Sequence, residues 1–156
     1  GDVTGEVLLA HVASAQGVVA AEAIAGRQPP RLSYVDMPRA TYCQPQVASI
    51  GMTEERARAE GYELKIGRFP FTASGKARAI GETDGLVKLI FDAKYGELLG
   101  AHILGSEATE MIGELGVAKA LEATAEGIFN TMHAHPTLSE AIMEAAENAD
   151  GHSIHI

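Results

Sequence analysis

The feature that most constrains the fold of this chain is a change in its hydrophobic period near residue 105. Before that point, apolar and polar residues alternate, most clearly at Val87, Leu89 and Phe91, which is typical of strands with one buried face. After it, apolar residues recur at helical spacing, at Met111, Ile112, Leu115 and Ala118. Strands grouped ahead of closing helices predict an α+β fold with a mostly antiparallel sheet, packed with helices.

Strand and turn signals place the sheet in the middle of the chain. Residues 40–51 and 62–71 each predict one strand, and residues 86–104 predict a two-stranded hairpin that turns at Tyr95 and Gly96. Residues 72–85 show neither period and are predicted to be a loop or irregular turn.

Two helices are expected ahead of the hairpin. Residues 8–25 are rich in Ala and Val, which predicts a helix buried on most sides that ends at Gly26. Residues 52–61 predict a short exposed helix, because Thr53 is a suitable N-cap and acidic residues precede the arginines. A proline-rich stretch, residues 27–40, is expected to be a connecting arm.

Two more helices are expected after the hairpin. Residues 106–125 predict a long helix in which Gly113 and Gly116 make room for a close neighbour. Residues 137–149 predict the last helix, followed by a short tail.

Composition narrows the function. The chain has 156 residues, of which 46% are hydrophobic, enough for one domain with a core. Its net charge of −9, without a Lys/Arg cluster, argues against nucleic-acid binding. No apolar run reaches the roughly 20 residues that span a bilayer, so a soluble, cytoplasmic protein with no membrane partner is expected. A start without Met suggests a piece of a longer protein.

Redox and nucleotide chemistry cannot be complete within this sequence. Cys43 is the only cysteine, so neither an intrachain disulfide nor a CxxC pair can form. No G-x-G-x-x-G or Walker sequence is present to bind a pyrophosphate.

The segment "MHAHPTLSEA", residues 132–141, is the strongest candidate site and has three interpretations. Thr137 and Glu140 match a capping box, which needs no chemistry. Alternatively, His135 is a general base and Glu140 fixes its tautomer, with His133 as a neighbour in the hydrogen-bond network. A metal site would need the tail histidines His152 and His155 to fold back, and no metal is expected.

Several segments together carry a resemblance to a known family. "GRFPF", "TDGLVKLIFD", "LLGAHILG", "EMIGELGVAKALE" and "HAHPTLSEA" resemble the C-terminal region of the dihydrolipoamide dehydrogenases, a branch of the flavoprotein disulfide oxidoreductases. The doubled histidine of His-x-His-Pro-Thr favours this branch over relatives that share only His-Pro-Thr. The resemblance extends over nearly the whole chain.

The resemblance implies an interface domain over residues 41–156 that forms a homodimer and sends a histidine into the partner subunit's active site. By position, His135 would take a proton from a dihydrolipoamide thiol, Glu140 would orient it, and His133 would assist. The family's His-Pro peptide is cis, which would make Pro136 a shaping element of the loop. The lipoyl-bearing acyltransferase of a 2-oxo acid dehydrogenase complex is the implied partner.

The resemblance also assigns the start of the chain to the end of an FAD-binding domain, residues 1–26. Five residues there would contact the flavin: Asp2, Leu8, Leu9, Ala10 and His11. FAD and NAD are expected in the whole protein, but none is expected on this chain alone, which should be inactive. The alternative is a non-catalytic dimerisation or docking module whose acidic surface meets a basic partner.

Overall fold

The computed structural model describes all 156 residues, which form two compact units, Gly1–Met37 and Pro38–Ile156. The first unit contains a 3-10 turn, η1 (Asp2–Thr4), and the helix α1 (Ala10–Ile24). The helix lies where the sequence predicts it, and Gly26 follows with a φ of 77°. This left-handed geometry suits glycine, which has no Cβ to clash.

The predicted burial of the first helix is wrong. Val12 is the only buried residue of α1, whereas Val18 and Ile24 are 59% and 88% exposed. The apolar residues of α1 lie on most of its sides, but the unit Gly1–Met37 is too small to bury them. One side-chain contact ties α1 to the following segment, from Gln16 Nε2 to the Tyr34 hydroxyl at 3.0 Å.

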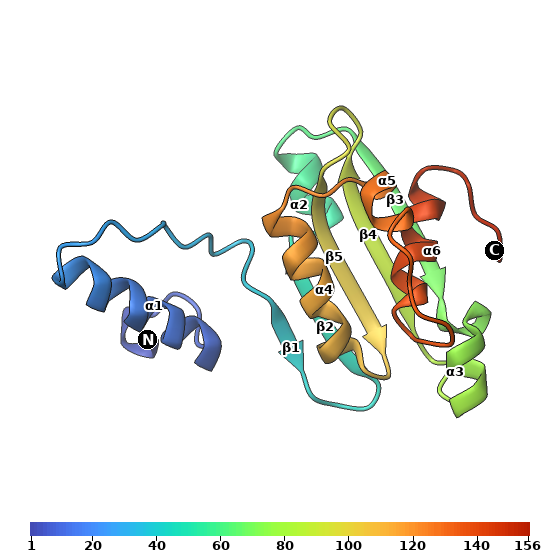
Figure 1. Ribbon diagram of the computed structural model, residues 1–156, viewed down its shortest axis with the longest axis horizontal. Helices are drawn as coiled ribbons and strands as arrows, with labels where there is room; N and C mark the ends of the chain where they lie inside the picture. The colour runs from blue at the N-terminus through green and yellow to red at the C-terminus, as the bar shows by residue number, and fades with distance from the viewer. The chain divides into compact units, whose positions relative to one another are not determined.

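The second unit is built on a five-stranded antiparallel sheet, as the α+β prediction requires (Figure 1). Its strands in chain order are β1 (Arg39–Thr41), β2 (Gln46–Gly51), β3 (Leu64–Pro70), β4 (Leu86–Asp92) and β5 (Leu98–Gly105). Their spatial order is β1-β2-β5-β4-β3, so the predicted hairpin β4–β5 occupies the middle of the sheet and β3 lies at one edge.

The single strand predicted over residues 40–51 is in fact two strands. β1 and β2 pair antiparallel with each other, with Thr41 opposite Val47. The intervening residues, including Pro45 with its cis peptide bond, reverse the chain direction. Proline has no N–H for a ladder hydrogen bond, so it interrupts the strand at this point.

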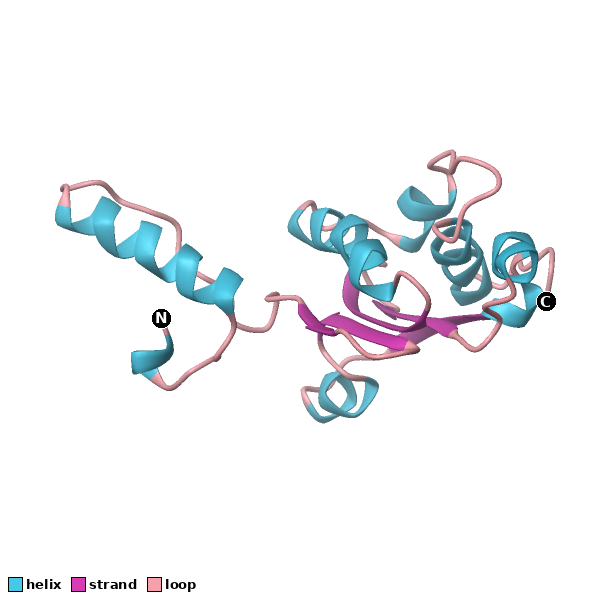
Figure 2. Cartoon of the chain, turned by 90° about the horizontal axis from the view of Figure 1, so that it is seen from below, coloured by secondary structure: helices cyan, strands magenta, loops and turns pink.

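Helices lie on both sides of the sheet (Figure 2). The helices α4 (Ala108–Ala120), α5 (Ala125–Phe129) and α6 (Glu140–Ala149) cover one face and bury most of the core. The helix α2 (Glu54–Ala59) covers the other face, where Ala57 packs against Ile90 and Leu99. Thr53 caps α2 as predicted, by accepting a hydrogen bond from the Arg56 backbone N–H.

Two helical predictions need correction. Residues 72–85 are not all loop: Phe71–Ala73 form a 3-10 turn, η2, and Gly75–Ile80 form the helix α3. Ser74 caps α3 by accepting from Ala77 N–H, and Gly81 ends it, but six residues are too few to show a helical period. The helix predicted over residues 106–125 ends at Ala120, and the separate α5 follows.

Close packing occurs at other glycines than the two predicted. Gly113 has open space around it, and at Gly116 the nearest atom to an added Cβ would lie at an ordinary 3.7 Å. At Gly67 of β3, by contrast, an added Cβ would lie 1.7 Å from the carbonyl oxygen of Ala145 in α6. Gly67 therefore lets α6 lie directly on β3. No helix of the chain is long and apolar enough to cross a membrane.

Candidate active site

The histidine loop, residues 130–139, connects α5 to α6 and lies against both α4 and α6. Leu138 anchors it in the core with 7% exposure, and the His135–Pro136 peptide bond is cis. α6 is fixed in turn against the edge strand, because Asn148 Oδ1 accepts a hydrogen bond of 2.8 Å from the Arg68 backbone N–H. The side chains at the start of α6 are thus held on a rigid part of the fold.

His135 and Glu140 form a hydrogen-bonded pair. His135 Nδ1 lies 2.8 Å from Glu140 Oε1, while Glu140 Oε2 accepts from the Thr137 backbone N–H at 2.8 Å. Half of the predicted capping box is therefore present. The other half is absent, since the Thr137 hydroxyl donates to the Ala134 carbonyl instead of accepting from Glu140. One oxygen of Glu140 thus accepts from the backbone ahead of α6, and the other contacts the imidazole of His135.

The surroundings of this pair favour a charged carboxylate and an accessible imidazole. Burial raises the pKa of Glu140, but the hydrogen bonds from Thr137 and His135 and the nearby His133 outweigh it, so this pKa lies below its ordinary value. The carboxylate therefore accepts from Nδ1–H, which leaves Nε2 free to take a proton. His135 is 77% exposed and Glu140 only 23%, so the imidazole faces outward over a sheltered carboxylate.

His133 has a different partner. Its Nδ1 lies 2.8 Å from the Thr131 carbonyl and its Nε2 lies 2.7 Å from Glu114 Oε1 on α4, with only 5% of the side chain exposed. Both nitrogens face acceptors, and a neutral imidazole has one N–H, so both bonds can be donated only by the doubly protonated ring. His133 is only two residues before His135 in the sequence, but it bonds to Glu114 instead of to the pair. The sequence analysis did not single out Glu114.

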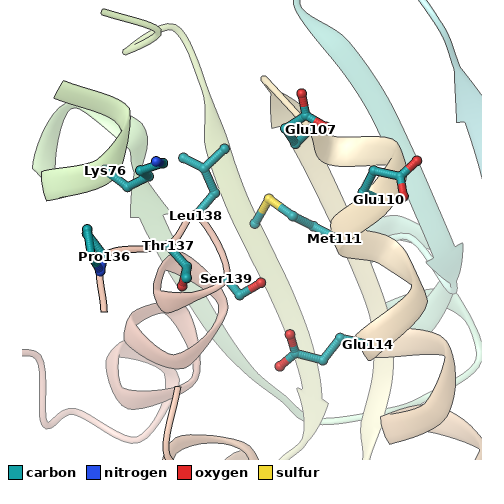
Figure 3. Close-up of a pocket in the computed structure, with 9 residues that line it drawn as sticks. All are labelled: Lys76, Glu107, Glu110, Met111, Glu114, Pro136, Thr137, Leu138 and Ser139. Carbon is teal, nitrogen blue, oxygen red and sulfur yellow. The ribbon is translucent and has the colours of Figure 1, made fainter. Parts of the chain in front are cut away.

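The larger cavity near the loop does not contain the pair. It has a volume of about 430 Å³ and lies between α4 and the end of the histidine loop, with Met111, Glu114 and Leu138 among its walls (Figure 3). A smaller cavity of about 260 Å³ is lined by both His135 and Glu140. The smaller cavity is the one that adjoins the candidate chemistry.

The residues expected at a flavin lie in the unit Gly1–Met37. Asp2 belongs to η1, Leu8 is 64% exposed, and Leu9, Ala10 and His11 form the start of α1. No side-chain hydrogen bond caps this end of α1.

The remaining histidines have protein partners. His102 Nε2 lies 3.1 Å from the Met52 carbonyl, His152 pairs with Asp150, and His155 pairs with Glu144. No group of three or more His, Cys, Asp or Glu side chains in the chain is arranged to hold a metal ion. Cys43 is exposed.

Residues 37–146 match the model of the pyridine nucleotide-disulphide oxidoreductase dimerisation domain. A dihydrolipoyl dehydrogenase of Mycobacterium leprae is 54% identical over 99% of this chain and 33% of its own length. A dihydrolipoyl dehydrogenase of Chlorobaculum tepidum is 55% identical over 96% of this chain and 32% of its own.

The fold is also similar to parts of two solved structures. LpdA from Mycobacterium tuberculosis superposes with a TM-score of 0.89 at 25% identity, covering 94% of this chain and 32% of that one. The HOCl-induced flavoprotein disulfide reductase RclA from Escherichia coli superposes with a TM-score of 0.86 at 26% identity, covering 94% and 34%. The chain spans about a third of the length of the curated relatives it matches.

Proposed function

This chain belongs to the dimerisation-domain family of the pyridine nucleotide-disulphide oxidoreductases, and from that premise we propose that it serves a dihydrolipoyl dehydrogenase. In that role it pairs two subunits and supplies His135 and Glu140 to the partner subunit's active site. The observation that carries the proposal is the His135–Glu140 hydrogen bond, which leaves the second imidazole nitrogen exposed.

The pair suits the removal of a thiol proton. Nε2 of His135 takes the proton of a dihydrolipoamide thiol, and the ionised Glu140 stabilises the imidazolium that forms. The resulting thiolate attacks the redox disulfide of the whole protein, forming a mixed disulfide and releasing one cysteine thiolate. The second thiol of the substrate then displaces the other cysteine as a thiolate, which closes the lipoamide disulfide and leaves the two cysteines reduced. FAD and NAD, when bound to the whole protein, would supply the final acceptors of these two electrons.

The first unit fits a role at the flavin. The uncapped start of α1, with Leu9, Ala10 and His11, offers backbone N–H groups and the positive end of a helix dipole. Those groups would stabilise negative charge on a reduced flavin ring, with Asp2 and Leu8 at its edge. Residues 1–26 would then be the end of the FAD-binding domain, residues 27–40 a connecting arm and residues 41–156 the dimerisation domain.

Dimerisation is proposed to involve the outer face of α4. Val117 of α4 and Leu121 at its C-cap are 62% and 75% exposed, and Gly113 has no atoms of its own chain near its Cβ position. An open glycine allows a close approach by a second copy of the chain. The net charge of −9 would also suit a basic segment of the lipoyl-bearing acyltransferase.

A chimera tests the proposed chemistry. This chain would replace the matching third of the Mycobacterium leprae dihydrolipoyl dehydrogenase, and the oxidation of dihydrolipoamide by NAD would be measured. We expect His135→Gln to lower kcat by about 10²- to 10⁴-fold, the usual size of the loss of a general base. His102→Gln is the matched control, because His102 Nε2 contacts the Met52 carbonyl and is not hydrogen-bonded to His135 or Glu140. Near-normal turnover in the His135 variant would reject the assignment.

The second candidate is a non-catalytic dimerisation or docking module of a related flavoprotein disulfide reductase. The observation in its favour is the strongly acidic charge of the chain. Binding of a basic peripheral domain to the chain should then weaken steeply as the salt concentration rises. A chimera that binds this domain but stays active after His135→Gln would favour this candidate over the catalytic one.

A further inference from the structure

A further cavity lies at the end of the sheet where α2 ends and β4 turns into β5 (Figure 1). None of its residues lines the cavity of His135 and Glu140. The structure therefore contains a concave site that the proposed function does not use. This cavity has a volume of about 510 Å³, and its walls are Gly61, Tyr62, Glu63, Asp92, Lys94 and Tyr95.

Backbone hydrogen bonds hold the walls of this cavity in place. The Ala93 N–H donates to the Glu63 carbonyl at 2.8 Å, which joins the turn after β4 to the residue before β3. The Tyr62 N–H donates to the Ala57 carbonyl at 3.1 Å, which ties Tyr62 to α2. All of these residues lie within the unit Pro38–Ile156. The cavity is therefore formed within one unit, and its walls are fixed before any ligand binds.

A ring face at this cavity already holds a cation. Lys94 Nζ lies 4.7 Å from the centroid of the Tyr95 ring, within the range of a cation–π interaction. Tyr62 lines the same cavity, and the two tyrosines, Tyr62 and Tyr95, are 37% and 70% exposed. Both side chains are thus accessible to a ligand. The ammonium of Lys94 shows the kind of group that the Tyr95 ring attracts.

Asp92 adds a negative charge to the wall of the cavity. It is only 5% exposed, and its two carboxylate oxygens accept from the backbone N–H groups of Lys94 and Tyr95 at 3.2 and 3.0 Å. Those donors are uncharged, so they orient the carboxylate without neutralising it. Glu63 supplies a second carboxylate. With two carboxylates and one ammonium, the walls favour a ligand of positive charge.

We propose that this cavity is a binding site for an organic cation with an alkylated ammonium group, such as choline. Such a group has few or no N–H donors, so aromatic faces compensate for its lost hydration. A metal ion fits less well, because no group of three or more His, Cys, Asp or Glu side chains in the chain is arranged to hold one. The bound ligand takes the place of the Lys94 ammonium over Tyr95, with its charge near Asp92. This site does not depend on the proposed chemistry of His135.

Binding can be measured on the chain itself by NMR, with choline as the probe. We expect saturable shifts of the backbone signals of Tyr62, Asp92 and Tyr95, with a Kd of about 1 mM. The matched ligand control is the neutral analogue of choline in which carbon replaces the ammonium nitrogen. It has the same shape without the charge, so it should bind at least about tenfold more weakly.

Substitutions at the walls test the two parts of the proposed contact. Tyr62→Leu should weaken choline binding about fivefold, whereas Tyr62→Phe keeps a ring face and should bind nearly as the original chain does. Lys94→Gln removes the cation that competes for Tyr95 and should strengthen binding about threefold. Lys76→Gln changes the net charge equally on α3, which follows the other end of β3, and should leave the Kd nearly unchanged.

The inference is overturned if choline shows no saturable binding at about 50 times the expected Kd, or if its neutral analogue binds equally well. It also fails if Lys76→Gln strengthens binding as much as Lys94→Gln does, because binding would then follow net charge alone. If Tyr62→Leu does not fold, Tyr62→Phe and Lys94→Gln still decide the matter. Loss of binding in the Phe variant, or no gain in the Gln variant, would contradict binding at the ring faces.

Discussion

Two histidines separated by one residue have opposite environments in this molecule. The His133 side chain is 5% exposed and bonded at both nitrogens, whereas the His135 side chain is 77% exposed and bonded at one. A ring held at both nitrogens has no site left for proton exchange with a substrate. The contrast supports our proposal that His135 is the base, and it favours a structural role of His133 in the loop over the assisting role that the resemblance implies.

Among the variants that test this contrast, Glu140→Gln in the chimera should cause the largest change, a loss of kcat. The Gln side chain can donate to His135 Nδ1, which would place the imidazole proton on Nε2 and remove the basic site. We expect kcat to fall by about 100-fold or more, as for other orienting carboxylates. Steady-state assays above and below neutral pH would check this, and a loss under tenfold would show that Glu140 does not orient the base.

The next effect concerns stability and His133. His133→Gln should lower the free energy of unfolding of the chain by about 1 to 2 kcal/mol, because Glu114 and the Thr131 carbonyl both lose their contact with the buried imidazole. Urea unfolding would measure the loss. His135→Gln, at an exposed position, should lower the free energy of unfolding clearly less. Equal losses for the two variants would break the comparison.

A smaller effect is expected at acidic pH. The folded-state pKa of Glu140 is below its unfolded value, so its contribution to stability is complete above an unfolded pKa of about 4.3 and is lost as the pH falls through the folded pKa. The difference in unfolding free energy between the chain and Glu140→Gln should therefore shrink below about pH 4. A difference that is constant down to pH 2 would contradict the charged pair.

The smallest effect is expected from removing residues 1–37. Both histidines and both of their partners belong to the unit Pro38–Ile156, which has its own core. Deletion of the first unit should change the unfolding free energy of the second by less than about 0.5 kcal/mol. The NMR signals of the two imidazoles should keep their positions, and a large change would show that the first unit shapes the loop.

The parts of the fold that the sequence predicted correctly are those with strong local signals. The central hairpin follows from alternation around a Tyr-Gly turn, and α2 follows from its cap at Thr53. The division of β1 from β2 depends on how a short edge strand pairs, and α3 is too short to show a period. These details follow from tertiary contacts that outweigh local preference.

The same limit applies to the candidate site. The pairing of His135 with Glu140 was predictable because five residues separate them at a helix start. The pairing of His133 with Glu114 joins residues 19 apart, and that of His155 with Glu144 depends on the path of the tail. Neither has a sequence period that would indicate it, so only the folded chain reveals these partners.

The central claim, that His135 acts in the partner subunit's site, is tested most directly by mixing two inactive forms of the chimera. One subunit carries His135→Gln, and the other lacks the redox disulfide supplied by the rest of the enzyme. If the base acts in trans, a randomly mixed dimer population should recover about a quarter of the normal activity, since half of the dimers would each hold one intact site. If mixed dimers form and remain inactive, the base does not act across the interface and the account is wrong.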